Sequence, residues 1–192
     1  MSARNKGLIV EGLRVMRRGR PVVNDVSVTV EPGQIVGLIG PNGAGKSSTF
    51  HAVVGLIPAR STRMELEGQN IARLAMFQRA RRGLGYLPQE ASVFEGLSVR
   101  DNLRAVLQIA LPASHRRPHL EKLMADFQLA DIANQMAQTL SGGQRRRLEI
   151  ARTMATKPAV VLLDEPFAGV DPISIDALHA AISAIRADGI GV

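Results

Sequence analysis

The stretch GPNGAGKS, residues Gly40 to Ser47, constrains this chain more than any other feature of its sequence. It matches the pattern of a glycine, four variable residues, a glycine, a lysine and a serine or threonine, which holds phosphate groups. The apolar run IVGLI precedes it and predicts a buried strand, while KSSTFHAVVGL follows it and predicts a helix. A strand, a glycine loop and a helix in this order predict an α/β fold that binds phosphate at a helix N-terminus.

The residues of this loop have different expected tasks. Gly43 and Gly45 would let backbone N–H groups face the phosphates, Lys46 would supply positive charge, and Ser47 would supply an oxygen for Mg²⁺. A charge-assisted hydrogen bond contributes about 1.5–3 kcal/mol, so its loss would lower nucleotide affinity about tenfold or more. The predicted binding residues are Gly40, Pro41, Asn42, Gly43, Ala44, Gly45, Lys46, Ser47 and Ser48.

A second apolar run, VVLLDEP, ends in two carboxylates, Asp164 and Glu165. Doubly wound sheets bind ligands at the carboxyl ends of their strands, where both residues are predicted to lie. We expect Asp164 to hold Mg²⁺. We expect Glu165 to orient or deprotonate an attacking water, a role worth about 10²–10⁴ in rate.

A further pair of glycines, Gly142 and Gly143, stands in LSGGQRRRLEI directly before a predicted helix. The N–H groups at a helix N-terminus also receive phosphate, so the chain carries two such devices. One nucleotide needs only one of them. The function of the chain has to account for the second.

The composition narrows the range of partners. Hydrophobic residues at 45% and charged residues at 21% are typical of a folded globular chain, and the longest apolar runs are too short for a membrane span. The net charge of +7 favours anionic phosphates or lipid headgroups. Direct nucleic-acid binding is not expected, because one Tyr, five Phe and no Trp offer few rings for stacking. With no cysteine, disulfides are excluded.

The remaining elements follow from hydrophobic periodicity. LIVEGLRVM and VVNDVSVTV predict antiparallel strands around a turn at Gly19, and GLGYLPQ predicts another strand. Helices are predicted for residues 71–82, for the segment after SGGQ and for a last segment that ends at Gly189. Helical spacing without strand signals from Val99 to about Gln138 predicts an inserted helical lobe, which Pro112 and Pro118 punctuate.

Five motifs in order resemble the nucleotide-binding subunits of ABC transporters: GPNGAGKS, Gln89 in LPQE, LSGGQ, VVLLDEP and Asp171 in GVDP. The resemblance covers nearly the whole chain. It implies a P-loop NTPase with a RecA-like mixed-sheet core over about 1–97 and 157–192, an N-terminal antiparallel β subdomain and a helical signature lobe over about 98–156. It also implies that the chain ends before the fold is complete.

The resemblance accounts for both glycine-containing helix N-termini. It implies a head-to-tail homodimer in which the signature Ser141, Gly142, Gly143 and Gln144 faces the ATP of the partner subunit. It also implies that Glu165 and Gln89 are catalytic, that Asp171 contributes to the nucleotide site, and that Ser47, Gln89 and Asp164 hold Mg²⁺. Transmembrane permease subunits are the implied further partners, with the chain peripheral on the cytoplasmic face of the inner membrane.

Within that family, GLGYLPQEASVFEGLSVRDNL and DEPFAGVDPISI resemble the ATPase subunits that power lipopolysaccharide export in Gram-negative bacteria. The alternative is an ATPase of branched-chain amino-acid import, and PQEASVF favours the exporter. Two departures from the family remain. Met16 and Arg17 stand where an aromatic ring usually stacks on adenine, and the chain ends at DGIGV, where the strand bearing the switch histidine would begin. The chain as given is therefore alternatively an ATP-binding clamp without efficient hydrolysis.

Other candidates receive simpler interpretations. Two arginine runs predict solvated helix faces: Arg145, Arg146 and Arg147, and Arg79, Arg81 and Arg82. Phe94 is either a contact for a permease or a core residue. His51, His115, His119 and His179 lack metal-ligand spacing and predict no metal site beyond the Mg²⁺ of the nucleotide.

Overall fold

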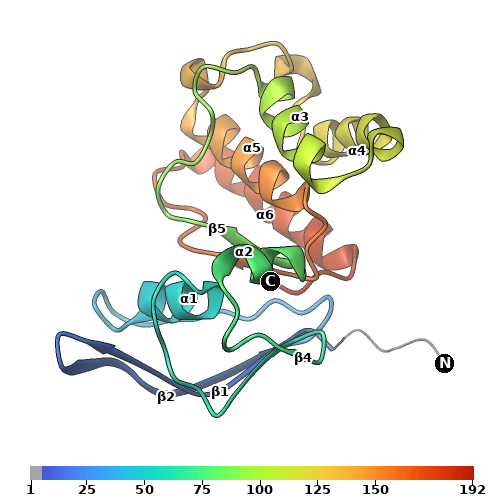
Figure 1. Ribbon diagram of the computed structural model, residues 1–192. Helices are drawn as coiled ribbons and strands as arrows, with labels where there is room; N and C mark the ends of the chain where they lie inside the picture. Colours follow the sequence, from blue (N-terminus) through green and yellow to red (C-terminus); the bar gives the residue numbers. More distant parts are fainter. Residues whose placement is uncertain (1–5) are drawn as a thin grey trace. The chain divides into compact units, whose positions relative to one another are not determined.

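The computed structural model describes residues 6–192, which form two compact units (Figure 1). The first unit consists of the chain up to Tyr86 together with Pro158–Asp164 and Ile185–Val192. The second consists of Leu87–Lys157 and Glu165–Ala184. The chain thus passes from one unit to the other between Asp164 and Glu165. The core and lobe boundaries expected above stay a prediction.

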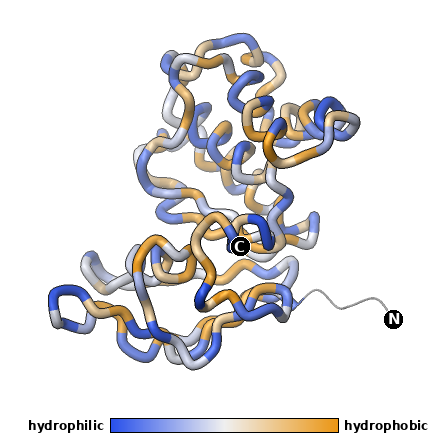
Figure 2. Tube along the Cα trace, in the orientation of Figure 1, coloured by the Kyte–Doolittle hydropathy of each residue, from blue (hydrophilic) through white to orange (hydrophobic). Residues whose placement is uncertain are grey.

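An antiparallel sheet with the strand order β2-β1-β3-β4 forms the base of the first unit. Its strands are β1 (Leu8–Arg17), β2 (Arg20–Val30), β3 (Arg63–Leu66) and β4 (Gln69–Asn70). The long β1–β2 hairpin confirms the predicted turn at Gly19, whose φ of 76° is readily adopted only by glycine. The hairpin tip appears as a hydrophilic segment in Figure 2 because arginines surround the turn.

One face of this sheet is apolar. Val10, Leu13 and Val15 of β1 are almost fully buried, as are Met64 and Leu66 of β3. They pack in one cluster with Ala52, Val53 and Val54 of helix α1 (Lys46–Val54). The helix that follows the glycine loop is therefore held on the sheet by its own last turn.

Two further strands, β5 (Leu84–Leu87) and β6 (Val160–Leu163), form a two-stranded sheet and confirm the predictions for GLGYLPQ and VVLLDEP. The predicted strand at IVGLI is wrong for this structure. Val36 donates to the carbonyl of Val192 at 2.8 Å, and Val192 donates to that of Gln34 at 2.8 Å. Beyond Val36 no described residue pairs with this backbone, and Ile39 is 94% exposed.

Helix α2 (Met76–Arg81) is shorter than the helix predicted for residues 71–82. The solvated interpretation is also wrong for Arg79, which is 5% exposed, although Arg81 and Arg82 are exposed. The Arg79 guanidinium donates to the carbonyls of Ala52 at 2.8 Å and Val53 at 2.6 Å, both in the last turn of α1. Carbonyls at a helix end lack intrahelical donors, and the Arg79 guanidinium donates to them instead. Burial lowers the pKa of this guanidinium.

The second unit is mainly helical, as predicted. Its long helices are α3 (Val99–Ala110), α4 (Ala113–Asp126), α5 (Gly142–Met154) and α6 (Pro172–Ala187), and the last of these continues into the first unit. Short 3₁₀ turns η1 (Ala130–Ile132) and η2 (Ala137–Thr139) lead to α5. Pro112 precedes α4, whereas Pro118 lies inside it, so this second proline does not end the helix.

No helix within residues 6–192 combines the length and the apolar character that crossing a membrane requires.

Candidate nucleotide-binding site

The glycine loop leaves several backbone N–H groups available. Gly43 and Gly45 have φ angles of 80° and 94°, in the left-handed region that glycine adopts readily. A Cβ on Gly45 would lie 2.5 Å from the carbonyl oxygen of Val22, so this position also excludes any side chain. No described residue accepts a hydrogen bond from the N–H groups of Gly43, Gly45 or Lys46. They form the N-terminal end of α1, where a phosphate would be held.

The Lys46 side chain curls back over its own loop. Its Nζ donates to the carbonyl oxygens of Gly40 at 2.7 Å and Pro41 at 2.9 Å. The loop therefore already positions the one cation that the sequence assigns to phosphate binding.

Ser47 and Asp164 come together although 117 positions separate them in the sequence. Ser47 Oγ donates to Asp164 Oδ1 at 3.4 Å, and Asp164 is 5% exposed at the end of β6. A hydroxyl and a carboxylate are oxygen donors of the kind Mg²⁺ takes, so these residues fit the ion predicted for them.

Glu165 follows Asp164 in an unusual backbone conformation. Its φ is 48°, in the left-handed region that non-glycine residues rarely occupy, and such conformations cluster at functional sites. Its carboxylate Oε2 accepts a hydrogen bond from Gln89 Nε2 at 2.8 Å. Both residues belong to the second unit, and their side chains lie together as the two predicted catalytic groups.

The signature residues begin α5 with a capping box. Ser141 Oγ accepts from the N–H of Gln144 at 3.3 Å, and Gln144 Oε1 accepts from the N–H of Ser141 at 3.0 Å. No described residue accepts from the N–H groups of Gly142 and Gly143. Two donors at the end of a helix are therefore available to an anion.

The two signature glycines are also required by packing. A Cβ on Gly142 would lie 2.9 Å from the carbonyl oxygen of Gly169, and one on Gly143 would lie 2.2 Å from Ser174 Oγ. Ser174 in turn donates its hydroxyl to Asp171 Oδ2 at 2.8 Å. This hydrogen bond holds the pKa of the exposed Asp171 carboxyl below its ordinary value. Asp171 thus lies beside the signature, and Ser174 is a contact that the sequence analysis missed.

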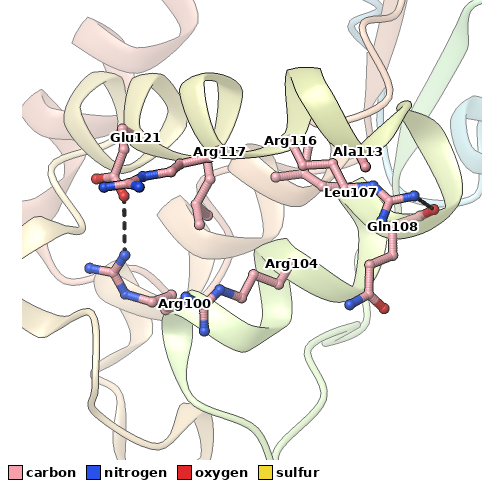
Figure 3. A pocket seen from close by; sticks show the side chains of 9 residues that line it. Arg100, Arg104, Leu107, Gln108, Ala113, Arg116, Arg117 and Glu121 are labelled. Atoms are coloured by element: carbon pink, nitrogen blue, oxygen red, sulfur yellow. Dashed lines mark hydrogen bonds and ion pairs between the residues drawn. The ribbon is translucent and has the colours of Figure 1, made fainter.

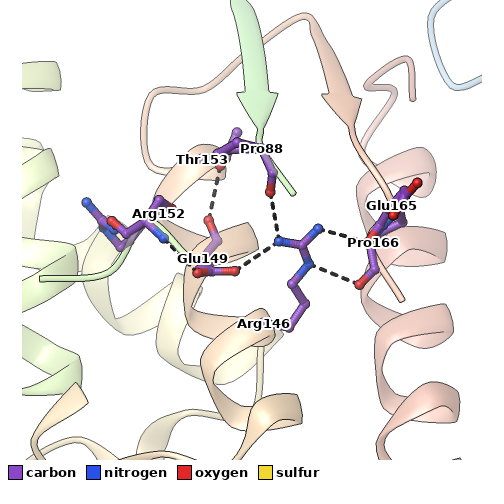
Figure 4. A network of polar contacts seen from close by, with 8 residues as sticks. Pro88, Arg146, Glu149, Arg152, Thr153, Glu165 and Pro166 are labelled. Carbon is purple, nitrogen blue, oxygen red and sulfur yellow. Dashed lines mark hydrogen bonds and ion pairs between the residues drawn. The ribbon is translucent and has the colours of Figure 1, made fainter. Parts of the chain in front are cut away.

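A buried arginine connects the two segments of the second unit that carry the predicted catalytic residues (Figure 4). Arg146 is 6% exposed, so its solvated interpretation is wrong, whereas Arg145 and Arg147 are half-buried. Its guanidinium donates to the carbonyls of Pro88 at 3.0 Å, Glu165 at 3.2 Å and Pro166 at 3.0 Å. It therefore holds the backbone next to Gln89 and that of Glu165 at once. Arg146 is flanked by two arginines, so its neighbours in the sequence gave no signal of this burial.

Glu149 completes this network. Its carboxylate accepts from Arg146 Nη1 at 3.0 Å and from the N–H of Ser92 at 2.9 Å. One turn further along α5, Arg152 donates to the carbonyl of Ser92. Its Cζ lies 4.4 Å from the ring centroid of Phe94. Phe94 is 47% exposed, so its alternative interpretation as a core residue is wrong.

The hairpin tip that contains Arg17 adjoins the glycine loop. Arg17, Arg18, Arg20 and Val22 line an open pocket, and the carbonyl of Val22 faces Gly45. Met16 is 59% exposed. Guanidinium groups stack on planar rings, so an arginine at this tip can contact a base without an aromatic side chain.

Comparisons with known proteins show what the whole chain is similar to. The family model described as ABC transporter matches residues 23–168. The chain is 51% identical over 187 residues to the lipopolysaccharide export system ATP-binding protein LptB of Escherichia coli K12, covering 96% of this chain and 78% of that protein. LptB of Haemophilus influenzae is 49% identical with the same coverage. A solved structure described as the ATP binding subunit of an ABC transporter superposes with a TM-score of 0.80 at 28% identity, covering 96% of this chain and 76% of that one.

Proposed function

The chain belongs to the ABC transporter family as an ATP-binding, ATP-hydrolysing subunit with the P-loop NTPase fold, and we propose that it powers lipopolysaccharide export. The similarity to LptB proteins over nearly the whole chain supports this cargo. We further propose that the subunit works as a head-to-tail dimer on transmembrane permease subunits, at the cytoplasmic face of the inner membrane. The exposed ring of Phe94 is the proposed permease contact.

The observation that carries the nucleotide assignment is the pairing of Ser47 with Asp164 beside a helix N-terminus whose N–H groups have no acceptor within residues 6–192. Residues Gly40–Ser48 would hold the phosphates, with Lys46 exchanging its loop carbonyls for phosphate oxygens. Mg²⁺ held by Ser47 and Asp164 would neutralise charge on the transferring phosphoryl group.

Glu165 is the proposed general base. A carboxylate that accepts a hydrogen bond from Gln89 is held in one orientation, and Arg146 holds the backbone that carries it. Such a group accepts a proton from an attacking water and typically contributes about 10²–10⁴ in rate. We therefore expect Glu165→Gln to lower phosphate release about 100-fold without lowering ATP affinity.

The signature would act on the ATP of the partner subunit. Gly142 and Gly143 present two N–H groups that no described residue uses, and a ligand that binds only the dimer stabilises it by mass action. Light scattering of the Glu165→Gln variant tests this directly. Dimer should form with ATP and not without it, and Ser141→Arg should abolish it. A dimer of the same stability in all three conditions would contradict the clamp.

A test of the proposed cargo requires the membrane subunits. We expect the permease subunits that purify with this chain to stimulate its ATPase activity in proteoliposomes when lipopolysaccharide is present. Stimulation by branched-chain amino acids in place of lipopolysaccharide would favour the import alternative. A chain that binds MgATP but releases no phosphate in either system would favour the clamp without efficient hydrolysis.

A further inference from the structure

A cationic pocket lies between α3 and α4 in the second unit, lined by none of the residues assigned to nucleotide (Figure 3). It is open to solvent and has a volume of about 460 Å³. Four arginines and one glutamate line it, which leaves a net charge of +3. The charged residues are Arg100, Arg104, Arg116, Arg117 and Glu121.

One of these arginines fixes the shape of the pocket. Arg116 at the start of α4 donates from Nε to the carbonyl of Leu111 at 2.8 Å and from Nη2 to that of Gln108 at 3.0 Å. Gln108 lies in the last turn of α3 and Leu111 is its C-cap residue, so both carbonyls stand at a helix end where intrahelical partners are lacking. These hydrogen bonds tie the start of α4 to the end of α3 within this unit, so the pocket does not need a partner to form.

The other arginines can exchange their partners at small cost. Arg100 pairs with Glu121 at 3.2 Å and Arg104 with Asp101 at 3.1 Å, and most of these side chains are about half exposed. Exposed ion pairs contribute only about 0–1 kcal/mol, so an incoming carboxylate could replace them. Arg117 has no hydrogen-bond or ion-pair partner among residues 6–192.

The floor of the pocket is apolar. The buried side chains that line it are those of Leu107 of α3 and Leu120 of α4. Inorganic phosphate has no apolar group that could contact these leucines. An occupant with acidic groups around an apolar side chain fits both the cationic rim and the floor.

We propose that this pocket binds a short acidic segment of a partner protein, with its carboxylates on Arg100, Arg104 and Arg117 and a leucine-like side chain on the floor. The guanidinium fork matches a carboxylate with two parallel hydrogen bonds, so Arg is well suited to this recognition. Binding of such a segment requires neither nucleotide nor the transported cargo.

Fluorescence anisotropy on the 192-residue chain tests the proposal, with a short fluorescein-labelled peptide in which pairs of glutamates flank leucines. We expect saturable binding without ATP. The double substitution Arg104→Gln and Arg117→Gln should weaken it about tenfold, because both side chains are exposed and their loss leaves the fold intact. The matched control Arg73→Gln and Arg82→Gln removes two exposed charges outside the pocket and should change the affinity less than twofold.

Two altered peptides and one alternative ligand complete the test. Replacing the glutamates by glutamines, or the leucines by serines, should each abolish the saturable signal. Equal weakening by the two double substitutions would overturn the proposal, because net charge alone would then explain binding. Binding of phosphatidylglycerol vesicles that depends on Arg104 and Arg117, with no binding of the peptide, would also overturn it and would assign the pocket to a membrane surface.

Discussion

Arg146 and Glu149 form a buried ion pair one turn apart on α5, with Arg146 Nη1 3.0 Å from Glu149 Oε2 and both side chains less than 10% exposed. Arg146 also donates to the backbone carbonyls of Pro88, which precedes Gln89, and of Glu165 and Pro166. A buried charge is tolerated only when its partners are complete. The pair therefore ties the stability of the second unit to the geometry of Glu165.

Arg146→Ala should lower the free energy of unfolding by about 3–5 kcal/mol, because it leaves the carboxylate of Glu149 buried without its cation. Urea denaturation measures this change. Arg147→Ala is the matched control, because that side chain is half-buried and its bond to Gln128 is exposed. The control should cost less than about 1 kcal/mol. Equal decreases in the free energy of unfolding for both variants would contradict a stabilising role of the buried ion pair.

Gly143→Ala should destabilise the protein by about 1–3 kcal/mol, because its Cβ would lie 2.2 Å from Ser174 Oγ. Adding Ser174→Gly removes the opposing atoms and should recover at least half of the loss. Gly142→Ala is the control, since its Cβ would meet the carbonyl of Gly169 and not Ser174. A double-mutant cycle from thermal unfolding measures the coupling. The same rescue of Gly142→Ala would refute the contact.

Lys46→Ala should lower ATP affinity about tenfold or more, since it removes a charge-assisted contact to phosphate. The chain should stay folded, because within residues 6–192 Lys46 Nζ donates hydrogen bonds only to carbonyls of its own loop. Titration with a fluorescent ATP analogue gives the affinity, and circular dichroism checks the fold. Unchanged ATP affinity in a folded variant would contradict the assignment of the glycine loop to phosphate binding.

His119 should make the protein less stable as pH falls through about 6.5, its ordinary pKa. Burial and the nearby Lys157 lower the pKa of this imidazole in the folded state, so the unfolded chain takes up the proton first. Urea denaturation at pH 7.5 and 5.5 measures the difference. His119→Gln should reduce the loss between these two values, whereas His115→Gln, at an exposed position, should not. Identical pH profiles for the wild type and His119→Gln would contradict the burial effect.

The elements that the sequence determined by itself are those with local causes. The turn at Gly19 needs a positive φ, the helix after Gly45 starts where the glycines end, and the capping box of Ser141 and Gln144 lies within four residues. The five motifs also indicated the family, because their residue types and order are specific. None of these features needs a distant part of the chain to form.

The tertiary structure alone decided the partners of charged and apolar groups that are far apart in sequence. Arg79 and Arg146 belong to arginine runs that predict solvated helix faces. Each is nevertheless buried, because the fold brings backbone carbonyls from distant segments within hydrogen-bond distance of its guanidinium. The apolar run before the glycine loop was expected to be a strand, but a strand forms only where a neighbour pairs with its backbone. Periodicity records which residues are apolar or charged, whereas burial depends on which backbone groups the folded chain places opposite them.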